Sequence, residues 1–217
     1  VKAGVYEIIA AWNPSGAGSQ QEVTSILAEI MRLKQICAID KVEAIADMAT
    51  EKSDSDSDGG NTGKVLIFSQ FVPVVNEIVK RLGHEAVAYT GEVDQAERTR
   101  IYDRFLRDKS LKFFVATWQT AGEGLNLQAA NTVIFADLFW TPANHQQCEE
   151  RAYGRLADPH PIDAYYLVCQ NTIETWIQEI LQRKLEVIEQ TVEGLDTERT
   201  KSIAGELLKR MKQEMGR

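Results

Sequence analysis

The sequence predicts an α/β domain whose parallel sheet is covered by helices on both faces. From Lys64 onward, short apolar segments alternate with segments whose apolar residues recur at helical spacing. The apolar run 113–116 stops at a glycine-containing polar loop, and a second apolar run, 132–136, soon follows. The 217 residues, 44% of them hydrophobic and 26% charged, are enough for a substantial core and ordinary for a globular protein.

Two helices are expected before the alternation begins. Ser19-Gln-Gln-Glu22 is a capping box that opens the first helix, which continues to about Cys37. A shorter helix follows, and residues 1–50 together should form a helical segment that packs on the α/β lobe. Residues 51–63 are rich in Ser, Asp and Gly and have nothing to bury, so we expect an acidic flexible linker there.

Residues 64–170 form the lobe itself. Strands are expected at 65–69, 86–89, 112–116, 132–136 and 164–168, and helices at 73–82, 94–107 and 142–153. Pro73 in the first turn and Gly83 after the last turn mark the ends of the first of these helices. Residues 171–217 should form a helical extension, in which Asn171-Thr-Ile-Glu174 caps a long helix and a last helix covers about 197–213.

Two ligand-binding patterns near the linker fail on their spacing. Asp54-Ser-Asp-Ser-Asp-Gly59 opens like a calcium loop, but Val65 occupies the twelfth position, where a bidentate Glu belongs. Gly59-Gly-Asn-Thr-Gly-Lys64 looks like a phosphate loop, but no Ser or Thr follows the Lys, and the pattern precedes a strand instead of following one. The sequence therefore predicts no metal site and no phosphate loop in this chain.

Composition narrows the class of protein further. The net charge of −8 argues against binding nucleic acid by bulk charge. Cys37, Cys148 and Cys169 are scattered, which argues against a disulfide framework or a zinc site and fits a reducing cytoplasm. In a bacterium or phage we expect association with the nucleoid, and in a eukaryote a nuclear protein. No apolar run approaches the ~20 residues that span a bilayer, so no membrane partner is expected. The start at Val1, without Met, indicates a piece of a longer chain.

The loop after the apolar run 113–116 carries the main candidate site. Its glycines let backbone N–H groups approach an anion, and its Thr and Asn side chains add hydrogen-bonding groups. Downstream, Trp140 to Arg155 contains two arginines near helical spacing, Arg151 and Arg155. Simpler interpretations are an ordinary tight turn for the loop and surface ion pairs for the arginines. The order of several motifs along the chain favours a functional site over these simpler interpretations.

These motifs resemble the second RecA-like lobe of SWI/SNF-type DNA translocases, which are superfamily two helicase-like ATPases. The resemblance covers about residues 25–180. Its matching blocks are Lys64 to Phe71, the Gly-x6-Arg-x6-Phe spacing of Gly91, Arg98 and Phe105, the block Thr117 to Leu127 with one extra residue before Ala121, Trp140 with Pro142, and Gln147 to Arg151. The resemblance implies a RecA-like fold with flanking helices at both ends.

The resemblance also implies roles for individual residues. Arg151 and Arg155 would be catalytic arginine fingers that neutralise charge on a transferring phosphoryl group. Gly122, Gly124 and Gln147 would lie toward the nucleotide. Candidate DNA-binding residues would be Ser69, Gln70, Gly91, Thr117 and Asn126. ATP and Mg²⁺ would be bound mainly by a first lobe that precedes this one, and the partners would be that lobe and double-stranded DNA.

One departure from the family pattern concerns the second arginine. Gly154 stands where the second arginine belongs, and Arg155 comes one residue later. One residue on a helix turns a side chain by ~100°, so we expect the helix to end at Gly154 and the following loop to re-aim Arg155. By itself the chain should be monomeric, bind no nucleotide and hydrolyse no ATP. The alternatives are a non-catalytic RecA-like interaction module and a lobe of a strand-separating helicase.

Overall fold

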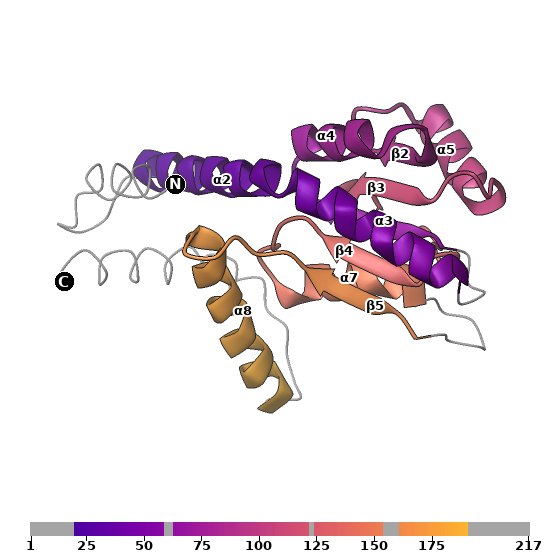
Figure 1. The fold of residues 1–217 in the computed structure, drawn as a ribbon. Coiled ribbons are helices and arrows are strands. Elements are labelled where there is room, and N and C mark those ends of the chain that lie inside the picture. Colours follow the sequence, from indigo (N-terminus) through magenta and orange to yellow (C-terminus); the bar gives the residue numbers. More distant parts are fainter. Residues whose placement is uncertain (1–19, 59–62, 122–123, 154–160, 191–217) are drawn as a thin grey trace. The chain divides into compact units, whose positions relative to one another are not determined.

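The computed structural model describes residues 20–58, 63–121, 124–153 and 161–190 (Figure 1). The chain divides into two compact units, which are considered separately. The larger unit, here called the lobe, comprises residues 38–139 and 143–167. The smaller unit contains the chain up to Cys37, residues 140–142 and the chain from Val168 onward. The predicted last helix at 197–213 and the predicted cap at Ser19 lie outside the described residues.

A five-stranded, wholly parallel sheet forms the centre of the lobe, which confirms the predicted fold class. Its strands are β1 (Val65–Ser69), β2 (Ala86–Tyr89), β3 (Phe113–Thr117), β4 (Thr132–Phe135) and β5 (Asp163–Tyr166), in the order β2-β3-β1-β4-β5. Parallel strands need crossover connections, and the helices between them supply these. All five carboxyl ends therefore meet at one edge of the sheet, hereafter the carboxyl edge.

Helices cover both faces of the sheet, as predicted. On one face, α3 (Val42–Asp58) and α4 (Val72–Leu82) contact each other and the central strands. On the other face, Phe105 of α5 (Gln95–Arg107) and Cys148 and Ala152 of α7 (Pro142–Tyr153) belong to one buried cluster with Leu66 and other alternate strand residues. Because side chains alternate along a strand, central strands that are buried on both faces are continuously apolar.

The prediction of a loop at residues 51–58 is wrong, because α3 continues to Asp58. Thr50 and Ser55 donate their hydroxyls to the carbonyl oxygens four residues earlier, both at 2.9 Å, which satisfies their polar groups within the helix. Ser53 is buried and donates to the Gly63 carbonyl oxygen at 2.6 Å, which ties the end of α3 to the start of β1. Residues 42–58 are therefore part of the lobe.

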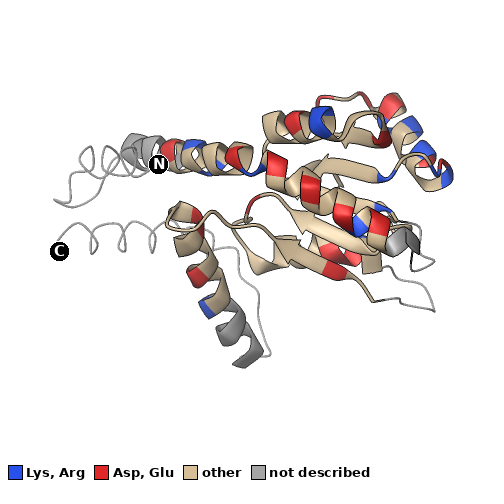
Figure 2. Cartoon of the chain, viewed as in Figure 1, with Lys and Arg blue, Asp and Glu red and all other residues tan. Residues whose placement is uncertain are grey.

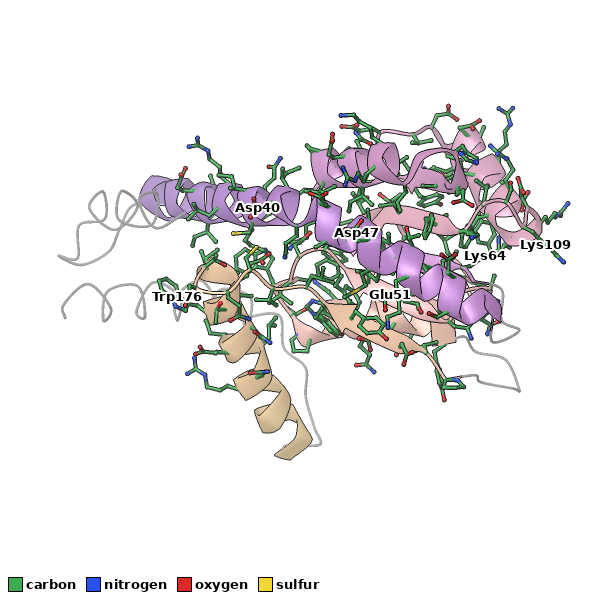
Figure 3. All side chains as sticks on the ribbon, viewed as in Figure 1. Asp40, Asp47, Glu51, Lys64, Lys109 and Trp176 are labelled. Atoms are coloured by element: carbon green, nitrogen blue, oxygen red, sulfur yellow. The ribbon has the colours of Figure 1, made fainter. Side chains whose placement is uncertain are left out.

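Lys64, the last residue of the phosphate-loop pattern that the sequence excluded, stabilises the end of α5 (Figure 3). Its ammonium donates to the carbonyl oxygens of Phe105, Asp108 and Leu111, at and beyond the end of α5. A cation is favourable there because the helix dipole places partial negative charge at the carboxyl end. Burial lowers the pKa of Lys64, and the charge of Asp108 opposes that shift.

Smaller differences concern the ends of elements. The strands at 113–117 and 163–166 each begin one residue from their predicted starts, and a short helix, α6 (Trp118–Ala121), follows Thr117 where we expected loop. Gly83 has φ 72°, as the stop of α4 requires.

In the smaller unit, α2 (Gln20–Asp40) contributes its residues up to Cys37, and α8 spans Ile173–Gln190. The backbone N–H of Glu174 donates to the Thr172 hydroxyl at 3.1 Å, so the predicted segment does cap α8, with Thr172 as the capping residue. None of the helices in the described ranges is long and apolar enough to cross a membrane.

Candidate nucleotide and DNA edge of the lobe

Asp137, which follows β4, joins two strands at the carboxyl edge. Its Oδ2 atom accepts hydrogen bonds from the Ser69 hydroxyl at 2.6 Å and from the Gln70 backbone N–H at 3.0 Å. Its Oδ1 atom accepts from Gln70 Nε2 at 2.6 Å. Asp137 is 0% exposed. The carboxylate thus fixes the end of β1 against the segment after β4, an arrangement we call the Asp137 latch.

Burial changes the interpretation of Ser69 as a DNA contact. The Ser69 side chain is 0% exposed. Its hydroxyl donates to Asp137 and accepts from the Phe71 N–H at 3.1 Å, so it is used inside the lobe. Gln70 is half-buried and also donates to the Leu138 carbonyl oxygen at 2.9 Å. Both residues shape the edge and are held by the Asp137 latch.

Thr117 and Gly91 come together at the ends of β3 and β2. The Thr117 hydroxyl lies 2.8 Å from the hydroxyl of Thr120 in α6. A methyl group added at Gly91 would stand 3.6 Å from the same Thr120 oxygen. Gly91 is exposed and Thr117 is buried. The structure therefore gathers a hydroxyl pair beside an open stretch of backbone, a combination that suits a phosphate group.

The loop after α6 is tied to the last turn of α7. The Leu127 N–H donates to the Arg151 carbonyl oxygen at 2.9 Å, and the Tyr102 hydroxyl donates to the Asn126 carbonyl oxygen at 3.0 Å. Asn126 is exposed, and its side-chain oxygen accepts from the Gln128 N–H at 3.2 Å. The two motifs that the sequence placed 25 residues apart, around Asn126 and Arg151, are thus neighbours in the lobe.

Aromatic packing holds α7 in place. His145 is buried, its ring stacks on Phe139 with centroids 4.7 Å apart, and its Nε2 accepts from the Phe139 N–H at 3.0 Å. Cys148 lies one turn before Arg151 and Ala152, and burial raises its pKa to about 12 despite the positive charge of Arg151. This thiol is therefore a packing group in the core of the lobe.

The remaining candidates are divided between described and undescribed residues. Arg151 and Gln147 are half-buried and lie one turn apart on α7. Gly124 is exposed with φ 73°, a backbone conformation that favours glycine. Gly122 and Arg155, together with the predicted helix stop at Gly154, lie outside the described residues.

Sequence reasoning missed three residues that support this edge: Asp137, Thr120 and Tyr102. Only Asp137 carried a signal, because it is an acidic residue placed directly after an apolar strand, as Ser69 is placed at the end of another. Thr120 and Tyr102 act through contacts between distant segments. They could not be found without the strand order.

Exposed acidic residues run along α3, and Glu92 and Asp94 add exposed acidic residues just after β2 (Figure 2). Exposed acidic residues at the end of α2 and along α3 are Asp40, Glu43, Asp47, Glu51 and Asp54. Among them, Glu43 pairs with Arg81 at 2.6 Å and Asp54 pairs with Lys112 at 3.4 Å. In the part of the chain that the structure describes, no group of three or more His, Cys, Asp or Glu could hold a metal ion.

This fold and edge define a RecA-like lobe of a helicase-like ATPase. The C-terminal domain of the SWI2/SNF2 ATPase of Sulfolobus solfataricus is similar, with 25% identity and a TM-score of 0.63 over 93% of this chain and 90% of that one. The SWI2/SNF2 ATPase core of S. solfataricus in complex with dsDNA gives 28% identity and a TM-score of 0.65, over 86% of this chain and 41% of that one. Human DNA annealing helicase and endonuclease ZRANB3 is 27% identical over 173 residues, 78% of this chain.

The family model of the helicase conserved C-terminal domain matches residues 40–155. The chain belongs to this family, and it is the second RecA-like lobe of a SWI/SNF-type ATPase. The resemblance inferred from the sequence is confirmed. The match covers 16% of the length of ZRANB3, so the chain spans only a small part of such relatives.

Proposed function

We propose that this lobe is the C-terminal motor lobe of an ATP-dependent double-stranded DNA translocase. The observation that carries the proposal is the hydrogen bond between the Leu127 N–H and the Arg151 carbonyl oxygen. It couples the loop that presents Asn126 to the helix that carries Arg151. If Asn126 contacts DNA and Arg151 contacts the nucleotide, this local structure would link the two contacts, which supports a motor that couples hydrolysis to movement.

On the nucleotide side, Arg151 would act as an arginine finger toward ATP bound by the first lobe. A guanidinium presents a planar set of donors that can span two phosphate oxygens and offset the charge that develops during phosphoryl transfer. Mg²⁺, when bound, would neutralise the β- and γ-phosphates. Its ligands would come from the first lobe, as expected from the sequence. Gly124 and Gln147 would line the same side of the lobe. The sequence motifs assign a nucleotide contact to Gly122 as well, and a second arginine finger to Arg155.

On the DNA side, the exposed groups of the carboxyl edge would contact one strand. We propose direct phosphate contacts by the backbone at Gly91 and by Asn126, both of which are exposed. Ser69, Gln70 and Thr117 would act indirectly by fixing the shape of the edge through their internal hydrogen bonds. Closure of the two lobes on ATP would then move these contacts along the strand.

The proposal is tested in the full-length enzyme by Arg151→Ala and Arg151→Lys. The catalytic rate of DNA-stimulated ATP hydrolysis should fall by about 10³–10⁵ with alanine, while the KM for ATP changes only a few-fold, because most nucleotide contacts belong to the first lobe. Lysine should restore little, since an ammonium lacks the planar fork. Arg155→Ala should also be slow if the loop re-aims that side chain. Normal hydrolysis in both alanine variants would refute the motor proposal.

A matched control is Arg100→Ala on α5, whose side chain is 73% exposed and pairs with Glu97 at 3.1 Å. It should leave hydrolysis unchanged. The chain alone should show no DNA-stimulated turnover, with or without Mg²⁺. A full-length enzyme that binds partner proteins but neither hydrolyses ATP nor responds to DNA would instead identify a non-catalytic interaction module.

A further inference from the structure

Cys37 and Cys169 both belong to the smaller unit, and each lies close to a point where the chain passes to or from the lobe. The chain first enters the lobe at Ala38 and leaves it for the last time after Leu167. Within the smaller unit, the Cys169 sulfur lies 3.5 Å from the carbonyl oxygen of Cys37 and donates to it. Both cysteines are reduced in the structure. Two thiols that are far apart in sequence are therefore neighbours.

We propose that Cys37 and Cys169 form a reversible disulfide under oxidising conditions. A carbonyl oxygen is about 2.4 Å from its own Cα, so the Cys169 sulfur is at most about 6 Å from the Cys37 Cα. A disulfide places the two Cα atoms about 4.4–6.8 Å apart, so the two residues would have to lie within that range once the bridge has formed. Rotation of the Cys37 side chain toward Cys169, together with an adjustment of the backbone, would bring the two sulfurs together.

The surroundings of Cys169 hold its backbone in place. The Cys169 N–H donates to the buried carboxylate of Glu174 at 2.8 Å, and its carbonyl oxygen accepts from the Thr172 and Thr175 hydroxyls at 2.7 and 3.3 Å. These bonds belong to the first turn of α8 and its cap. Because this backbone is fixed, closing the bridge requires little further ordering, which favours intramolecular closure over a bond to another molecule.

The exposure of the two cysteines indicates which one reacts first with an external disulfide. Cys169 is half-buried, whereas Cys37 is 1% exposed, so a small disulfide such as oxidised glutathione reaches Cys169 first. The Cys169 thiolate attacks one glutathione sulfur and releases one glutathione thiolate. Cys37 then attacks the Cys169 sulfur of the mixed disulfide, loses its proton to solvent and releases the second glutathione. The two cysteine sulfurs are oxidised by two electrons, and one oxidised glutathione is reduced to two thiols.

The bridge would close residues 38–168 into one covalent loop. Within the lobe, Lys41 already connects the two ends of this loop, because its ammonium donates to the Leu167 carbonyl oxygen at 2.6 Å. A disulfide across a loop of this length removes much of the freedom of the unfolded chain. The melting temperature of the oxidised chain should therefore exceed that of the reduced chain by roughly 5–15 °C.

The test is to treat the chain with oxidised glutathione and to map its peptides without reduction. The expected result is a linked peptide pair containing Cys37 and Cys169, a protein lighter by two hydrogens and one remaining free thiol. Cys148→Ser should still form the bridge, and Cys37→Ser and Cys169→Ser should not. A lasting glutathione adduct on Cys169 beside a free Cys37, a bridge to Cys148, or only intermolecular dimers would each overturn the proposal. Mapping of the wild-type chain decides the question even if a variant folds poorly.

Discussion

Removing the carboxylate of the Asp137 latch should destabilise the lobe more than any surface change. In Asp137→Ala, three donors lose their acceptor: the Ser69 hydroxyl, the Gln70 N–H and the Gln70 amide. Each hydrogen bond to a charged group contributes about 1.5–3 kcal/mol, and these contributions do not simply add. The change leaves donors without an acceptor, which costs about 1–3 kcal/mol for each buried one, so a total of about 3–5 kcal/mol is expected. The expected loss of melting temperature is roughly 6–20 °C.

Thermal and urea unfolding followed by circular dichroism measures the effect. Ser69→Ala, which removes one donor to Asp137 and the acceptor of the Phe71 N–H, should cost about 1–2 kcal/mol. The double variant should cost less than the sum of the two single changes, because the same hydrogen bond is lost in both. Asp47→Ala, at an exposed position of α3, is the control and should stay within about 0.5 kcal/mol of wild type.

The result that would refute this reasoning is a melting temperature of Asp137→Ala within 2 °C (about 1 kcal/mol) of the wild-type value. In that case the free energy of desolvating the buried carboxylate would equal the stabilisation that its hydrogen bonds provide. Additive effects of Ser69→Ala and Asp137→Ala would show that the two residues do not depend on each other. In either case the ends of β1 and β4 would be held by the sheet alone.

Three further predictions concern single side chains. Lys64→Met should lower stability by about 1–3 kcal/mol in urea titrations. In the wild-type chain, the free energy of unfolding should rise with pH between the lowered pKa of Lys64 and 10.5, because the unfolded chain binds more protons than the folded chain in that range. Lys64→Met should remove this rise. At pH 8 the Cys148 thiolate should be about 1,000-fold scarcer than at the ordinary pKa of 9.0, so iodoacetamide should label Cys169 first in the native chain. Tyr102→Phe should cost about 1 kcal/mol and speed amide exchange near Asn126, measured by mass spectrometry.

The sheet could be predicted from the sequence because each strand is a short apolar run and each connection is a helical pattern. Both signals are local, and every predicted strand of the lobe is present. The end of α3 could not be predicted in the same way. Its Ser- and Asp-rich composition favours a loop, and what overrides that preference is the bond from Ser53 to Gly63, together with hydroxyl bonds back along the helix. The first of these depends on tertiary packing.

The candidate site was predictable as a set of motifs but not as a geometry. The sequence could indicate that Asn126 and Arg151 belong to one kind of site, because their motifs resemble those of a known family. It could not indicate that the backbone next to Asn126 bonds to that of Arg151, or that Ser69 faces inward. Burial and pairing of this kind follow from the strand order, in which β1 lies between β3 and β4.

The acidity of the chain is compatible with a DNA-binding edge because the contacts proposed there do not depend on the charge of the lobe. The exposed carboxylates of Asp40, Asp47 and Glu51 line the end of α2 and the side of α3 (Figures 2 and 3). The groups proposed to meet DNA are a glycine backbone and an amide, which add no charge. Contacts through neutral donors release few counterions, so binding by this lobe should weaken less steeply with salt than binding through lysines and arginines. In the full-length enzyme, Asn126→Ala should lower the affinity for DNA but leave the dependence of that affinity on salt concentration unchanged. This pair of results would agree with a neutral contact.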